Sequence, residues 1–218
     1  MNKELTKRFL SSFVILPLVL FLLINGSILF LFFLSILFLG TSYEWIKMCK
    51  KKNLLKIVGV MFLTLSFYSA FQIRNYAGLN LFLFIFAICI STDLGGYFFG
   101  KFFKGPKLTK ISPNKTYSGV IGSLLFSVIV GFIFSKYFYF SLYFIDSLNV
   151  IKSYELLLIF FILLISIISQ LGDLIISYFK RLAKVKDTGK IIPGHGGLLD
   201  RIDGLIFAMP ISYLFMVL

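Results

Sequence analysis

The fold class is decided by the stretch at residues 154–178, which reads YELLLIFFILLISIISQLGDLIISY. Apolar side chains fill this stretch as one block rather than in an alternating or a striped pattern, and its only charged residues are Glu155 and Asp173. A helix needs about 20 mainly apolar residues to cross the hydrocarbon core of a bilayer. The stretch therefore predicts a transmembrane helix.

The composition extends this prediction to the whole chain. Of the 218 residues, 59% are hydrophobic and only 14% are charged, whereas globular chains carry about 25% charged residues. We therefore predict an all-α, polytopic integral membrane protein with about seven transmembrane helices, built as a single membrane-embedded domain over residues 1–218. The seven apolar segments are Phe9–Ile24, Ser27–Trp45, Leu54–Gln72, Leu79–Gly100, Tyr117–Phe140, Tyr154–Tyr178 and Gly204–Leu218.

The orientation follows from the positions of lysine and arginine. With the N-terminus in the cytoplasm, 19 of the 22 basic residues fall in cytoplasmic segments, and only Arg74, Lys136 and Lys152 lie on the far side. Cytoplasmic loops of membrane proteins are enriched in these residues, so we predict a cytoplasmic N-terminus. The net charge of +13 then reflects basic loops near anionic headgroups, and no nucleic-acid partner is expected. Cys49 and Cys89 stand far apart without a CxxC motif, so neither a disulfide framework nor a zinc site is indicated.

Acidic residues in or beside apolar spans are costly and usually mark function. Asp93 begins a stripe with Tyr97 and Lys101, one turn apart on one helix face, beside glycines that allow close helix contact. The stripe is either an ion pair within a packed helix or the polar lining of a site. Glu44, next to Trp45, is interpreted as an interface residue at a helix end.

A second polar face lies at the end of the sixth predicted span, where Asp173, Ser177, Lys180 and Arg181 share one side of the helix. A carboxylate facing lipid would cost about 2.5–3.5 kcal/mol. Asp173 should therefore face inward, toward a cationic partner or a metal ion, although a structural ion pair between helices is the alternative.

A loop rich in glycine follows, from Lys186 and Asp187 through His195 to Asp200 and Asp203. Its glycines can direct backbone N–H groups at an anion. The last two aspartates, three positions apart, can share a face at the start of the last helix, close enough to bind one divalent ion. Mg²⁺ prefers carboxylate and phosphate oxygen. His195 is the single histidine and cannot form a histidine-based metal site by itself.

The loop at residues 101–116 is rich in lysine, including Lys115, and forms a cationic rim. It either recruits anionic lipid or binds a triphosphate or phospholipid headgroup. Acids for a metal, basic groups for phosphate and glycines for close approach, all at one membrane face, indicate phosphoryl or nucleotidyl transfer.

The segment Ser177–Asp203, SYFKRLAKVKDTGKIIPGHGGLLDRID, resembles the signature of the phosphatidate cytidylyltransferase (CDP-diacylglycerol synthase) family at every specified position. The resemblance extends to GDLIISYFKR at Gly172–Arg181, DLGGYFFGK at Asp93–Lys101 and SPNKTYSGVIGS at Ser112–Ser123. It covers residues 85–218, and the preceding residues are too generic to test.

The resemblance implies an enzyme that converts CTP and phosphatidic acid to CDP-diacylglycerol and pyrophosphate in phospholipid biosynthesis. It also implies a homodimer in the bacterial inner membrane, with an active site at the cytoplasmic face and a requirement for Mg²⁺. Whether a monovalent cation is also needed stays open.

The resemblance further implies roles for single residues. Asp173 and Asp200 are the expected metal ligands. The expected catalytic residues are Asp173, Asp200, Asp203, Asp187, Lys186 and His195. The expected substrate-binding residues are Ser177, Lys180, Arg181, Arg201, Lys101, Lys115 and Asp93.

Two other classes of protein fit the sequence less well. CDP-alcohol phosphotransferases carry the pattern D-G-x2-A-R-x8-G-x3-D-x3-D, which has no match in the chain. A transporter or scaffold for anionic lipids would distribute its polar groups through the depth of the membrane, whereas the charges here gather at one face.

Overall fold

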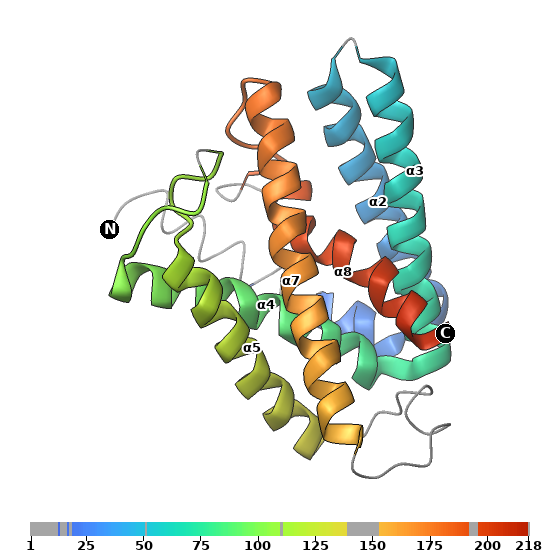
Figure 1. Cartoon of the computed structure of the whole chain (residues 1–218). Coiled ribbons are helices and arrows are strands. Elements are labelled where there is room, and N and C mark those ends of the chain that lie inside the picture. The colour runs from blue at the N-terminus through green and yellow to red at the C-terminus, as the bar shows by residue number, and fades with distance from the viewer. Residues whose placement is uncertain are drawn as a thin grey trace.

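The computed structural model describes residues 13, 17, 19–50, 52–109, 111–138, 153–191 and 196–217. Throughout these ranges every regular element is a helix, which confirms the predicted all-α fold class (Figure 1). The elements are α2 (Ser27–Cys49), α3 (Asn53–Gln72), the short π-helix η1 (Ile73–Ala77), α4 (Gly78–Phe103), α5 (Tyr117–Tyr137), α7 (Ser153–Leu182) and α8 (Leu199–Val217).

Four helical segments in these ranges are long and apolar enough to cross a membrane, namely Ile28–Cys49, Asn53–Phe103, Tyr117–Tyr137 and Glu155–Leu182. The second of them contains α3, η1 and α4. The chain changes direction there at Gly78, whose φ of 88° is a conformation that glycine adopts without steric cost. α8 is not among the four, because Asp200, Arg201 and Asp203 occupy its first turns. Half of the first predicted span, Phe9–Ile24, lies outside the described residues.

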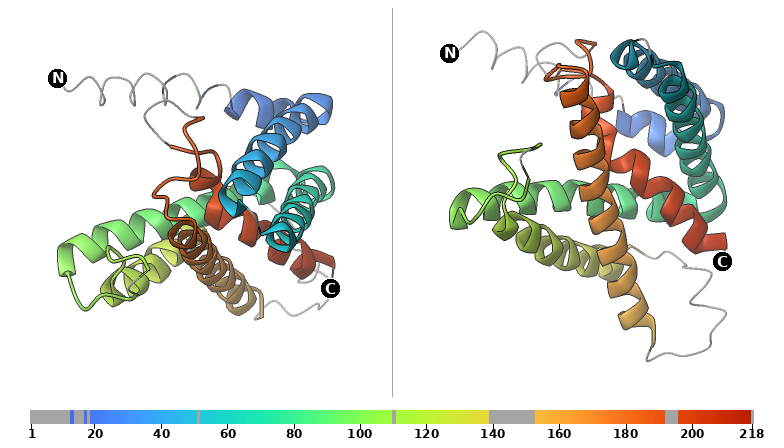
Figure 2. Two further views of the ribbon diagram at one scale, coloured as in Figure 1. Left: turned by 90° about the horizontal axis from the view of Figure 1, so that it is seen from above. Right: turned by 45° about the horizontal axis from the view of Figure 1, so that its top comes forward.

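α5 lies on one side of α7 and α2 and α3 lie on the other, while α4 crosses behind α7 from the side of α5 to the side of α3 (Figures 1 and 2). α8 runs obliquely between α3 and α7 and contacts both. The central core is apolar: Phe84 of α4 stacks on Phe161 of α7 with ring centroids 6.3 Å apart, and both side chains are fully buried. Large apolar side chains also point outward, such as Met61 and Phe102, as expected for helices that face lipid.

Two crossings of helices depend on glycine. Where α4 meets α5, a Cβ atom on Gly95 would lie 2.8 Å from the carbonyl oxygen of Gly122, so the expected close contact beside Asp93 is confirmed. Where α7 meets α8, a Cβ atom on Gly172 would lie 2.9 Å from the carbonyl oxygen of Asp203. Only residues without a side chain let these backbones approach so closely. The second crossing places Asp173 beside Asp203.

Candidate active site

Asp173 of α7 is paired with Lys115, which ends the loop between α4 and α5. Lys115 Nζ lies 2.5 Å from Asp173 Oδ2, and both side chains remain about a quarter exposed, at 26% and 27%. The local sequence fixes this lysine, because Thr116 caps α5 by accepting a hydrogen bond from the Gly119 N–H at 3.1 Å. Ser177 Oγ donates to Asp173 Oδ1 at 3.3 Å. The predicted cationic partner of Asp173 is thus Lys115, in the loop between α4 and α5.

If the chain has the activity that the family resemblance implies, replacing Lys115 by alanine should lower kcat/KM for CTP by roughly tenfold to a hundredfold, the usual effect of losing a hydrogen bond between charged groups. The measurement is steady-state release of pyrophosphate by the purified protein. Lys115→Arg should recover part of the loss, and equal rates for Lys115→Ala and wild type would exclude this lysine from the site.

Asp173 also lies beside two further carboxyl groups. Its side chain is within hydrogen-bonding reach of Asp203 on α8, and Asp93 of α4 is close enough to interact electrostatically with both Asp173 and Lys115. Two carboxylates at such a short separation repel each other unless a proton or a cation lies between them. The structure therefore brings acids from three helices close enough to influence one another electrostatically.

Asp200, the other predicted metal ligand, is held by hydrogen bonds at both carboxylate oxygens. Oδ1 accepts from Lys180 Nζ at 2.9 Å, and Oδ2 accepts from the N–H groups of Thr188 at 2.8 Å and Gly197 at 3.1 Å. Burial by itself would raise the pKa of Asp200, but the hydrogen bonds from Lys180, Thr188 and Gly197 lower that pKa below its ordinary value. Asp200 is thus an ionised anchor for Lys180 and for the loop before α8.

Lys180 links the two acidic groups. Besides its ion pair with Asp200, its positive charge acts on both Asp173 and Asp203. Asp173, Ser177 and Lys180 therefore do share one face of α7, as predicted.

Other predicted site residues pair with groups outside this cluster or are exposed. Lys101 Nζ contacts the hydroxyl of Tyr97 on its own helix at 3.4 Å. Arg181 Nε donates to the carbonyl oxygen of Ile111 at 3.4 Å, which ties α7 to the lysine-rich loop. Lys186, Asp187 and Arg201 are exposed, and His195 lies outside the described residues.

The sequence interpretation of Glu44 as an interface residue did not include its partners. Glu44 is only 1% exposed. Its carboxylate accepts hydrogen bonds from Thr188 Oγ1 at 2.8 Å and from the N–H groups of Leu198 and Leu199 at 3.0 and 2.9 Å. The signal that could have revealed this role is the high cost of an acid inside an apolar span, which requires a partner.

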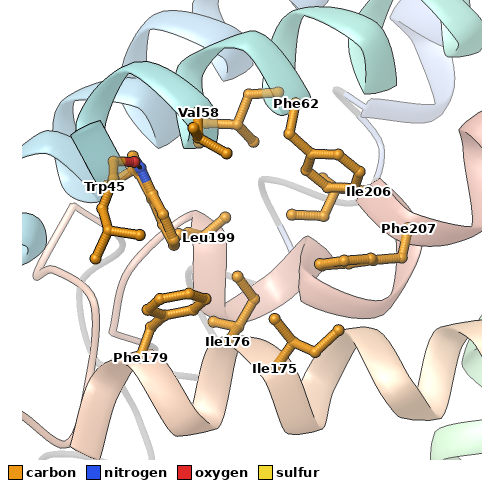
Figure 3. A pocket seen from close by; sticks show the side chains of 12 residues that line it. Trp45, Val58, Phe62, Ile175, Ile176, Phe179, Leu199, Ile206 and Phe207 are labelled. Atoms are coloured by element: carbon orange, nitrogen blue, oxygen red, sulfur yellow. Dashed lines mark hydrogen bonds between the residues drawn. The ribbon is translucent and has the colours of Figure 1, made fainter. Parts of the chain in front are cut away.

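An apolar cavity of about 130 Å³ lies between α2, α3, α7 and α8 (Figure 3). Ile175, Ile176 and Phe179 of α7 line it together with Phe62 and Ile206. Trp45 at its edge donates its indole N–H to the carbonyl oxygen of Leu55 at 2.9 Å, so its one polar group is already paired. The cavity suits hydrocarbon, and none of the acidic residues of the site lines it.

The acidic residues fit a magnesium ion in part. Across the described ranges, no three histidine, cysteine, aspartate or glutamate side chains form a group that could hold a metal by themselves. Mg²⁺, however, is usually bound by one or two carboxylates and completes its shell with water and substrate phosphate. Asp173 and Asp203, whose side chains lie within hydrogen-bonding reach of each other, supply two such carboxyl groups.

These features define a helical membrane protein whose acidic and basic side chains converge beside two lysine-rich loops. Residues 52–218 match the cytidylyltransferase family, and the chain belongs to that family. It is 40% identical over 155 residues to a phosphatidate cytidylyltransferase of Haemophilus influenzae, covering 71% of this chain and 50% of the relative.

Two further relatives carry the same name. The protein of Brucella suis is 38% identical over 139 residues, covering 63% of this chain and 47% of the relative. The protein of Staphylococcus saprophyticus is 33% identical over 162 residues, covering 74% and 58%. The chain thus spans about half the length of the curated relatives it matches.

Proposed function

We propose that the protein is a phosphatidate cytidylyltransferase, which converts CTP and phosphatidic acid to CDP-diacylglycerol and pyrophosphate. The observation that carries this proposal is the convergence of Lys115, Asp173, Lys180, Asp200 and Asp203 at one site. The site lies in a chain of the cytidylyltransferase family whose relatives bear this name.

The reaction joins two anions. A phosphate oxygen of phosphatidic acid attacks the α-phosphorus of CTP, the bond between the α-phosphorus and the bridging oxygen breaks, and pyrophosphate leaves. No covalent intermediate on the protein is required, so the protein's task is to position the reactants and to offset their charge. In this proposal Lys115 and Lys180 contact phosphate oxygens, and Arg181 does so through two parallel N–H groups.

The acids have a different role. Mg²⁺, when bound, would neutralise negative charge on the phosphates and on the departing pyrophosphate. Asp173 is the ligand that we propose from both the signature and the contacts. The signature predicts Asp200 as its partner, and this assignment stays a prediction. The contacts favour Asp203 in that place, since its carboxyl group lies within hydrogen-bonding reach of Asp173, whereas Asp200 is paired with Lys180 and with the loop before α8.

The placement in the membrane is also proposed. About seven spans, a cytoplasmic N-terminus and a site facing the cytoplasm of a bacterial inner membrane agree with the distribution of lysine and arginine. A single domain over the whole chain and a homodimer complete this proposal.

The proposed function is tested by measuring CTP-dependent release of pyrophosphate by the full chain in detergent, with and without phosphatidic acid. Release that requires the lipid and stops with EDTA is the expected result, and excess Mg²⁺ should restore it. Release without lipid would show a CTP hydrolase. No release from protein with a cooperative melting transition would favour transport or scaffolding of anionic lipids.

A further inference from the structure

The start of α8 has an unusual cap. The first N–H groups of a helix have no partner within the helix, and Ser, Thr, Asp or Asn usually supplies one just before its first turn. α8 begins at Leu199 after another leucine, Leu198, which has no polar side chain. The N–H groups of Leu198 and Leu199 instead donate to Glu44 of α2, which lies 154 positions before Leu198 in the chain.

The same carboxylate is connected to the site through Thr188. Thr188 Oγ1 lies 2.8 Å from Glu44 Oε2 and 3.1 Å from Asp200 Oδ2. The backbone N–H of Thr188 donates to that same oxygen of Asp200 at 2.8 Å. Thr188 therefore joins the buried acid of α2 to the acid that holds Lys180.

The surrounding chain leaves room for this arrangement. A Cβ atom on Gly197 would lie 2.6 Å from Glu44 Oε2, and one on Gly189 would also collide with the Glu44 carboxylate. Thr188 is itself buried, at 7% exposure. Glycine on both sides lets the loop close around the carboxylate, which indicates a built contact rather than a chance one.

We propose that Glu44 is a positioning residue, which acts through Thr188 to hold Asp200 and the beginning of α8 in the arrangement the reaction needs. Its carboxylate is hydrogen-bonded to Thr188, Leu198 and Leu199. This inference rests on the proposed function, because its effect is read in turnover, and it assigns to the first 51 residues a role in the site that the family signature does not contain.

The test compares Glu44→Gln, Thr188→Val, Thr188→Ser and the double variant Glu44→Gln/Thr188→Val in the full chain. The amide of Glu44→Gln presents an NH₂ group to at least one N–H or O–H donor. We expect kcat to fall by about tenfold to a hundredfold, with the KM for CTP little changed. Thr188→Val should show the same pattern, and Thr188→Ser, which keeps the hydroxyl, should recover most of the activity.

The double variant distinguishes positioning from separate structural damage. If Glu44 acts through Thr188, the double variant should be no slower than the slower single variant. Multiplied losses, or losses that follow the melting temperature alone, would overturn the inference. Glu155→Gln, an exposed glutamate in the first turn of α7, is the matched control and should keep wild-type turnover.

Different results would reject the proposed function and the role of Glu44. An inert wild-type protein would reject the proposed function. An active wild type with an equally active Glu44→Gln variant would reject only the role of Glu44.

Discussion

Replacing Asp173 by asparagine is expected to lower turnover by at least about a hundredfold, in the range found when a group that stabilises transition-state charge is removed. The amide keeps the shape of the side chain but loses its charge. Lys115 then loses its ion-pair partner, and Asp203 loses the neighbouring carboxyl group with which it would share a cation. The measurement is pyrophosphate release at saturating CTP and phosphatidic acid.

Folding should survive this change, because the Asp173 side chain is partly exposed rather than locked in the core. The melting temperature in detergent should therefore stay close to that of the wild type. Glu155→Gln, at the opposite end of the same helix, serves again as the control. Near-normal turnover by Asp173→Asn would remove this residue from the centre of the site and would favour a structural ion pair.

The second large effect concerns the crossing of α7 and α8. In Gly172→Ala the new methyl group would lie 2.9 Å from the carbonyl oxygen of Asp203 and 2.6 Å from Phe207 Cδ2. Since a backbone atom cannot rotate away, the helices must separate. Such overpacking costs typically about 1–3 kcal/mol, and here it also moves Asp173 away from Asp203. We expect a lower melting temperature together with a loss of turnover.

The control for this variant is Gly96→Ala on α4. A Cβ atom there would have its nearest neighbours at 3.8 Å, so this change should leave stability and turnover almost unaffected. If Gly172→Ala is as stable and as active as Gly96→Ala, the two helices do not need their close crossing, and the proposed placement of the acids at it is incorrect.

The sequence was sufficient to predict most of the helices, because a long apolar segment has no other stable structure in a bilayer. It also placed Asp173, Ser177 and Lys180 on one face of α7, since residues three and four positions apart on a helix are neighbours. α8 was harder to delimit. The apolar span was predicted from Gly204, whereas α8 begins at Leu199; Asp200 and Asp203 were expected at the start of this helix, and they lie in its first turns.

The pairing of residues from distant helices was beyond the reach of sequence patterns. Nothing in the spacing indicated that Lys115 would meet Asp173, or that Asp203 rather than Asp200 would lie beside it. These contacts depend on how α4, α7 and α8 cross. The partners of Glu44 were missed for the same reason, because they lie 144 to 155 positions further along the chain.

The capping of α8 by Glu44 has a consequence for how this protein is divided. The match to the family begins at residue 52, so a domain boundary drawn from sequence would leave Glu44 outside the family domain. The contacts in the structure give a different boundary. Glu44, which lies before the matched residues, is linked to Asp200 through Thr188. Exchanging N-terminal segments between relatives would therefore change the contacts that hold Thr188 and Asp200, even if every signature residue were retained.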